Sequence, residues 1–218
     1  MHFISTRGQV PPTPIDDALV AGLAPDGGLY VPGRMPRLDD WSPLSTLSAT
    51  ALRTLAPYFE GSALRDRLEA ICADAFSFDA PLRPLAGAGD HVLELFHGPT
   101  AAFKDYAARF LARALEGLRD PSAPPTTIVV ATSGDTGAAV AAAFHRRPGF
   151  RVVILYPDGK VSPRQAHGLG CWGDNVAAYR VEGSFDDCQR LAKQALADEA
   201  LRARVPLGSA NSISLGRL

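Results

Sequence analysis

The sequence lacks a long apolar run, a strong net charge and a paired set of cysteines. Its first fourteen residues contain one arginine and no apolar stretch, so they predict neither a secretory signal nor a transmembrane helix. We therefore expect a cytoplasmic protein. The formal net charge is −1, and lysine and arginine occur singly, which removes the long-range field that nucleic-acid and membrane-surface binders carry. The expected partner is a small molecule.

Cysteine is scarce and unpaired. Cys72, Cys171 and Cys188 are odd in number, far apart and without C-x-x-C spacing, which argues against a disulfide framework and against a zinc site. We expect reduced, mostly buried thiols with a packing role rather than a nucleophile. No metal is expected.

Apolar residues make up 46% of the chain and charged residues 21%, as in ordinary globular proteins. Residues 1–85 are broken by turn-forming segments and form a small irregular region, closed by Pro81 and Pro84. Within this region, residues 51–61 and 62–76 place apolar side chains at steps of three and four, which predicts two short amphipathic helices.

From residue 86 the pattern becomes an alternation of strands and helices, and buried strands between helices predict a three-layer α/β fold with a parallel sheet. Ser184 and Asp187 form a capping box for the last long helix. Residues 205–218 change from strand to helix and stop within the first turns, so we expect a domain that is incomplete at its C-terminus. The expected strands are 91–96, 126–132, 150–156 and 175–182, and the expected helices are 101–118, 135–147 and 184–201.

The segment ATSGDTG (131–137) lies between an expected strand and an expected helix. Free N–H groups at such a helix start, with the Ser133 and Thr136 hydroxyls, suit a carboxylate or a phosphate. Many α/β proteins use similar loops only to turn and cap a helix, and Asp135 is a suitable cap residue. The residues alone leave both interpretations open.

A second loop, FHGPTAAFKD (96–105), places Lys104 in the first turn of a helix. Desolvation and the helix dipole both favour a neutral amine there, which Schiff-base formation needs. The alternative is a solvated lysine paired with Asp105 or another acid, and His97 is more simply a turn residue than a general base. If the two loops follow neighbouring parallel strands, they share one crevice.

These segments resemble the threonine synthases. The likeness extends from ELFHGPT and AFKD (94–105) through ATSGDTGAAVA, VVILYPDGKVSPRQ and VEGSFDDCQ to Asn211-Ser212-Ile213 and Arg217, in the family's order, and it includes ISTRG (4–8) and GLAPDGGLYVP (22–32) near the N-terminus. The resemblance implies fold type II of the pyridoxal-phosphate (PLP) enzymes. It also implies conversion of O-phospho-L-homoserine and water to L-threonine and phosphate, the last step of threonine biosynthesis.

The resemblance also implies site residues and a division of the chain. Residues 1–85 would be the threonine synthase N-terminal region and 86–218 a partial catalytic domain. Lys104 would carry PLP and move protons as acid and base. Asp135 and Asn211 would bind the cofactor, and Lys160 and Arg164 would contribute positive charge for the anionic substrate. The residues implied in substrate binding are Ser133, Gly134, Thr136, Gly137 and Ser212.

The chain departs from the family pattern near its end. Ser214 replaces the second asparagine of N-S-I-N, and the family's later glycine-rich loop, of the type S-G-N-F-G, is absent. A non-catalytic remnant with an anion pocket or a subunit contact is therefore the alternative function. Another fold type II enzyme, such as a threonine dehydratase or a cysteine synthase, is disfavoured by the H-G-P-T and S-G-D-T-G motifs. An incomplete core exposes apolar surface, so we expect the isolated chain to be poorly soluble or to associate.

Overall fold

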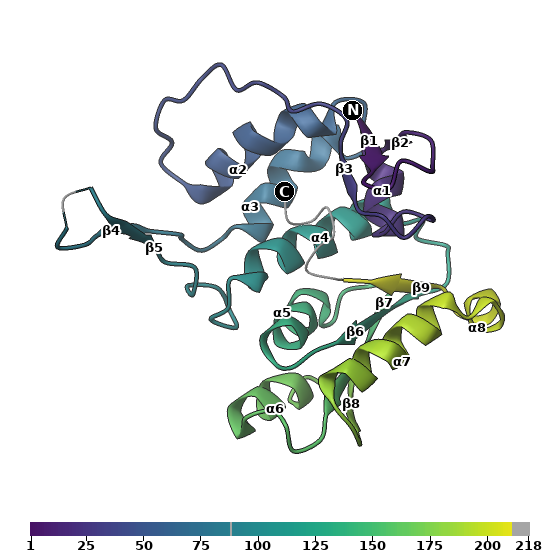
Figure 1. The fold of residues 1–218 in the computed structure, drawn as a ribbon. Helices are drawn as coiled ribbons and strands as arrows, with labels where there is room; N and C mark the ends of the chain where they lie inside the picture. Colours follow the sequence, from purple (N-terminus) through teal and green to yellow (C-terminus); the bar gives the residue numbers. More distant parts are fainter. Residues whose placement is uncertain (88, 211–218) are drawn as a thin grey trace.

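The N-terminal part of the chain is a small mixed region (Figure 1). The computed structural model describes residues 1–87 and 89–210. Three short strands pair antiparallel in the order β2-β1-β3. The two predicted helices are present with shifted bounds, each joined to a short 3-10 helix. The elements are β1 His2–Ser5, β2 Thr13–Pro14, α1 Ile15–Ala21, β3 Tyr30–Pro32, α2 Leu47–Leu55, η1 Ala56–Phe59, η2 Arg65–Arg67 and α3 Leu68–Ala75.

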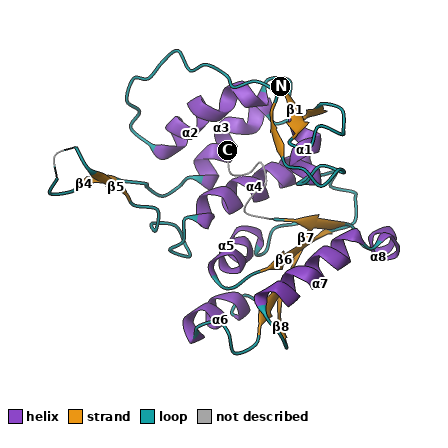
Figure 2. Ribbon diagram, in the orientation of Figure 1, coloured by secondary structure: helices purple, strands orange, loops and turns teal. Residues whose placement is uncertain are grey.

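The centre of the fold is a four-stranded sheet in the order β8-β7-β6-β9, and all of its pairings are parallel (Figure 2). Ile128 and Ile154, on the two middle strands, are at most 1% exposed. Such strands are covered on both faces, as parallel sheets require. The strands are β6 Thr126–Ala131, β7 Phe150–Pro157, β8 Val176–Val181 and β9 Leu207–Ser209.

Helices cover both faces of this sheet. The chain passes from β6 through α5 (Asp135–Phe144) to β7, and through α6 (Pro163–Gly170) to β8, moving one strand outward each time. It then returns through α7 (Phe185–Ala197) and α8 (Glu199–Arg204) to β9 on the other side of β6. Because crossovers are right-handed, this reversal puts α7 on the face opposite α5 and α6. The three-layer α/β fold predicted from the sequence is confirmed.

Helix α4 (Lys104–Leu118) joins the two parts of the molecule. It packs against α5 of the sheet domain and against α1 and α3 of the N-terminal region. The ring of Phe110 lies 5.9 Å from the ring of Phe59 and 6.0 Å from the ring of Phe76. One continuous apolar core therefore extends from the N-terminal helices to the sheet.

The expected strand 91–96 does not pair with a strand of the parallel sheet. Only His91–Leu93 form a strand, β5, which pairs antiparallel with β4 (Leu82–Pro84). This hairpin extends away from the body in Figure 1, and all residues of both strands are exposed. The prediction that this strand belongs to the parallel sheet is wrong, because a run of three residues pairs with the nearest available strand. The exposed apolar side chains of this hairpin, Leu82, Val92 and Leu93, support the expected self-association of the chain, which stays a prediction.

Two features of the helices were not predicted from the sequence: the division of one expected helix and the presence of helix α6. The expected helix 184–201 is divided at Asp198, whose side chain caps the separate helix α8. Helix α6 lies in a stretch that was assigned no structure, although Ser162 and Gln165 form a capping box at its start. Cys171 follows α6 and is exposed, whereas Cys72 and Cys188 are buried as expected. Burial raises the pKa of the Cys72 thiol to about 11.

The capping box of α7 offers a direct test of this part of the fold. Ser184 Oγ accepts from the Asp187 N–H at 3.2 Å, and Asp187 accepts from the Ser184 N–H at 2.8 Å. The latter bond, with the contacts to Arg190 and to the Ser184 hydroxyl, holds the pKa of Asp187 well below its usual range. We expect Ser184→Ala to lower the free energy of unfolding by about 1 kcal/mol in urea denaturation. Ser184→Thr should keep most of the stability, and equal losses from both variants would contradict the capping role.

Among the described residues, no helix has the length and apolar character of a membrane span.

Candidate functional site

The strand order reverses at one point, between β6 and β9, and segments leave the carboxyl ends of these two strands there. The loop after β6 contains Ser133–Gly137, and the segment after β9 begins at Ala210. A cavity of about 130 Å³ lies at this point, lined in part by Thr136, Ser209 and Ala210. The sheet therefore places the predicted anion loop at the position where open α/β sheets bind ligands.

Thr132, at the end of β6, holds this loop in shape. Its side chain is 2% exposed, and its Oγ1 accepts from the N–H groups of Gly134 and Gly137, both at 3.0 Å. Those two N–H groups are consequently directed inward. The exposed members of the loop are Ser133 and Asp135, and Thr136 is partly buried.

The two glycines of the loop are required by close packing. A Cβ on Gly137 would lie 2.5 Å from Thr132 Cγ2 and 2.6 Å from Leu169 Cδ2. Gly134 has a φ of 147°, and a Cβ there would lie 2.4 Å from Nε2 of Gln165. These contacts explain both glycines without a ligand, so their contact with substrate stays a prediction.

The loop after β7 approaches the anion loop from the side. Gln165 Nε2 donates to Asp135 Oδ1 at 3.3 Å, while its Oε1 accepts from the Ser162 N–H at 3.1 Å. The start of α6 is in this way tied to the start of α5. Lys160 and Arg164 lie in the same segment, and both are exposed.

Lys104 is the first residue of α4 and is partly buried. Its Nζ lies 4.1 Å from the centre of the Phe103 ring, a cation–π distance. Among the ion pairs of the described residues, none involves Lys104. Asp105, the suggested alternative partner, bonds Thr100 instead. The amine is therefore not neutralised by a carboxylate in this part of the chain.

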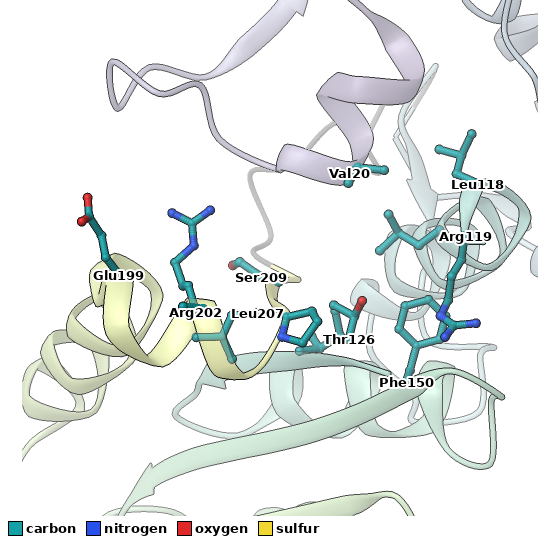
Figure 3. A pocket seen from close by; sticks show the side chains of 14 residues that line it. Val20, Leu118, Arg119, Thr126, Phe150, Glu199, Arg202, Leu207 and Ser209 are labelled. Carbon is teal, nitrogen blue, oxygen red and sulfur yellow. The ribbon is translucent and has the colours of Figure 1, made fainter. Parts of the chain in front are cut away.

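The far end of α4 shows which edge of the sheet Lys104 approaches. Leu118 and Arg119, at the end of α4, line a cavity of about 610 Å³ together with Thr126 and Phe150, where β6 and β7 begin (Figure 3). Helix α4 thus runs antiparallel to β6. Its fifteen residues span about 22 Å, close to the length of the strand. Its first residue consequently lies toward the carboxyl edge, where the loop Ser133–Gly137 lies.

The two predicted loops therefore approach each other, but not for the reason that was expected. The expectation placed them after neighbouring strands of one sheet, and β5 is not in that sheet. They approach each other because α4 packs beside α5 (Figure 1). His97 is held by Glu94, with its Nε2 2.8 Å from Glu94 Oε2, and stacks on Phe96. Asn211 and Ser212 lie outside the described residues.

The observed roles of three residues near these loops were not predicted from the sequence: those of Thr132, Gln165 and Asp105. The pattern Ser162-x-x-Gln165 is a recognisable capping box and could have revealed the helix, although not the bond to Asp135. Thr132 and Asp105 act through burial, and no local spacing rule identifies a buried hydroxyl or carboxylate in advance.

Comparison with known proteins gives two family matches. A model described as pyridoxal-phosphate dependent enzyme matches residues 81–212, and one described as threonine synthase N terminus matches residues 2–76. The first range includes Lys104 and the loop Ser133–Gly137. The second covers most of the irregular N-terminal region.

Curated and solved relatives agree with these models. The chain is 42% identical to the threonine synthase of Haemophilus influenzae, with 92% of this chain and 47% of that protein covered. The Escherichia coli threonine synthase is 41% identical, with coverage of 92% and 47%. A crystal structure of PLP-bound threonine synthase from Brucella melitensis matches with a TM-score of 0.89 at 38% identity, covering 100% of this chain and 49% of that one. The chain spans about half the length of the relatives it matches.

Proposed function

Because this chain belongs to the family of pyridoxal-phosphate-dependent enzymes, we propose that it is the part of a threonine synthase that carries the cofactor lysine, Lys104. The proposed reaction converts O-phospho-L-homoserine and water to L-threonine and phosphate. The observation that carries the proposal is the position of Lys104 at the start of α4, on the edge of the sheet where the Ser133–Gly137 loop lies. The proposed division at residue 85 lies close to the gap between the two matched ranges.

The small number of lysines narrows the choice of the residue that binds the cofactor. The sequence has three, Lys104, Lys160 and Lys193. Lys160 and Lys193 are exposed, the first on a loop and the second on α7, where it lines the cavity of about 130 Å³, whereas Lys104 is partly buried at a helix start. A lysine that holds an aldehyde cofactor needs an amine that is sheltered yet unpaired, and Lys104 best meets both conditions.

The residues present fit the lysine end of the cofactor. The amine of Lys104 lies over the ring of Phe103 and forms no ion pair among the described residues. The glycine-rich phosphate loop of the family is not among these 218 residues, so the chain's own residues account for part of the cofactor site.

Bound PLP supplies an electron sink for the reacting carbons. Lys104 would hold the cofactor, and its amine would accept and return protons at the substrate carbons. The hydroxyls of Ser133 and Thr136 donate to the substrate carboxylate, and Asp135 lies beside them, held by Gln165. Lys160 and Arg164 provide positive charge for the substrate phosphate. The proposed roles of Asn211 in cofactor binding and Ser212 in substrate binding rest on the motif alone.

We propose that the reaction takes place in the cytoplasm, which is supported by three free thiols that suit a reducing compartment.

The test of the proposed function has two readouts. The purified chain is mixed with PLP, reduced with borohydride and digested, and the cofactor mass is mapped to a peptide. In parallel, release of phosphate and threonine from O-phospho-L-homoserine is measured. We expect cofactor mass on the Lys104 peptide and phosphate release above that of heat-denatured protein. Cofactor attachment without turnover would favour the non-catalytic alternative, and no attachment at Lys104 would contradict the proposal.

A further inference from the structure

The turn in front of α4 is closed by a buried carboxylate. Asp105 is 0% exposed, and both of its oxygens accept hydrogen bonds from Thr100: Oδ2 from the N–H at 2.9 Å and Oδ1 from the hydroxyl at 2.8 Å. Both oxygens of this buried side chain are therefore satisfied by a single residue. Leaving such a buried polar group without its hydrogen bonds would be costly, so the turn and the start of α4 are held together.

The turn is packed directly on this side chain. A Cβ added to Gly98 would lie 2.5 Å from Asp105 Oδ2 and 2.7 Å from Asp105 Cβ. The turn also holds Ala101 at a φ of 55°, a left-handed conformation that a non-glycine residue adopts at a cost. The contacts to Asp105 compensate for this strain.

Successive residues of an α-helix are turned by about 100° around its axis. Because Asp105 faces inward against Gly98, its predecessor Lys104 leaves the helix about 100° away from that direction. Fixing one side chain therefore fixes the direction of the other. The position of Lys104 Nζ over the Phe103 ring fits this direction.

We propose that Asp105, acting through Thr100, is a positioning residue that sets the direction and accessibility of the Lys104 amine. This positioning role rests on the proposed function, in which Lys104 carries PLP. It concerns the geometry of Lys104 before any cofactor binds, so it can be tested without cofactor.

The first experiment measures the reactivity of the amine itself. The cofactor-free chain is methylated with formaldehyde and cyanoborohydride, and the initial rate at each of the three lysines is followed by peptide mass spectrometry. We expect Thr100→Val, which removes only the hydroxyl, to change the rate at Lys104 by about threefold or more, within the usual range for contacting residues. Rates at Lys160 and Lys193 serve as internal references and should not change. Thr100→Ser should restore the original rate at Lys104.

A matched control separates this effect from the loss of any threonine hydroxyl. Thr54 Oγ1 donates to the Thr50 carbonyl in α2, far along the sequence from the site, so Thr54→Val should leave the rate at Lys104 unchanged. Asp105→Asn should shift that rate in the same direction as Thr100→Val, and the double variant should show less than the sum of the two effects, because the residues act as one unit.

The second experiment measures attachment of PLP at Lys104 by titration, in which Thr100→Val should raise the PLP concentration needed by about tenfold. If wild type fails to attach PLP, the proposed function fails, while the methylation rates still decide the positioning role. A lowered melting temperature with unchanged methylation at Lys104 would show that the Thr100 bonds only stabilise the fold, and this result would overturn the proposal.

Discussion

Replacing Lys104 by alanine should abolish attachment of PLP and lower kcat/KM for O-phospho-L-homoserine by at least about 10⁴-fold. The expected loss combines the covalent hold on the cofactor with proton transfer, which alone contributes about 10²- to 10⁴-fold. Melting of the cofactor-free protein should change little, because Lys104 is only partly buried and forms no ion pair among the described residues. Phosphate release and the visible absorbance of added PLP measure both effects.

The other two lysines provide matched controls for this result. Lys160→Ala should leave PLP attachment intact and weaken substrate binding, if its charge serves the phosphate as proposed. Lys193→Ala should leave attachment intact as well. A visible band that persists in Lys104→Ala and disappears in either control would move the cofactor to a different lysine and contradict the assignment.

Replacing Thr132 by valine should cost about 2–6 kcal/mol of unfolding free energy and remove most of the activity. The variant keeps the shape of the side chain but takes away the acceptor of two buried N–H groups, those of Gly134 and Gly137. Each orphaned buried donor costs about 1–3 kcal/mol. The loop can recover these bonds only by changing its conformation, which would displace Ser133 and Thr136. Urea denaturation measures the loss of stability, and phosphate release measures the loss of activity.

A neighbouring threonine controls for the substitution itself. Thr127 lies on β6, the strand that Thr132 directly follows; it is 8% exposed, and its hydroxyl makes no hydrogen bond that the described residues reveal. Thr127→Val should therefore be neutral or slightly stabilising, and Thr132→Ser should retain the acceptor. A Thr132→Val protein as stable as Thr127→Val would show that the loop does not depend on this hydroxyl.

The strands and helices of the sheet domain were predictable because their signals are local and repeated. Ile128 and Ile154 lie in apolar runs bounded by turn residues, and the spacing of Phe110, Leu111 and Ala114 identifies one face of α4. Lys104 and the Ser133–Gly137 loop were found because each stands at a junction between elements, where backbone groups are left unpaired.

The rest depended on contacts between distant residues. A run such as His91–Leu93 reads the same whether its partner is a central strand or a hairpin arm, so its position could not be inferred. The roles of Thr132 and Asp105 follow from burial, and burial is a property of the whole fold. The bond from Gln165 to Asp135 joins residues thirty positions apart, and nothing in the local sequence specifies it.

The placement of β9 has a consequence for the order of folding during synthesis. Strands β6, β7 and β8 leave the ribosome in the order in which they pair, but the outer edge of β6 stays open until β9 arrives, when Val129 pairs with Ser209. Such a distant pairing is slow to close, and an open strand edge can associate with other chains while it waits. A nascent chain therefore remains open to association along this edge of β6 until β9 has emerged, and chaperone binding at this edge should last until then.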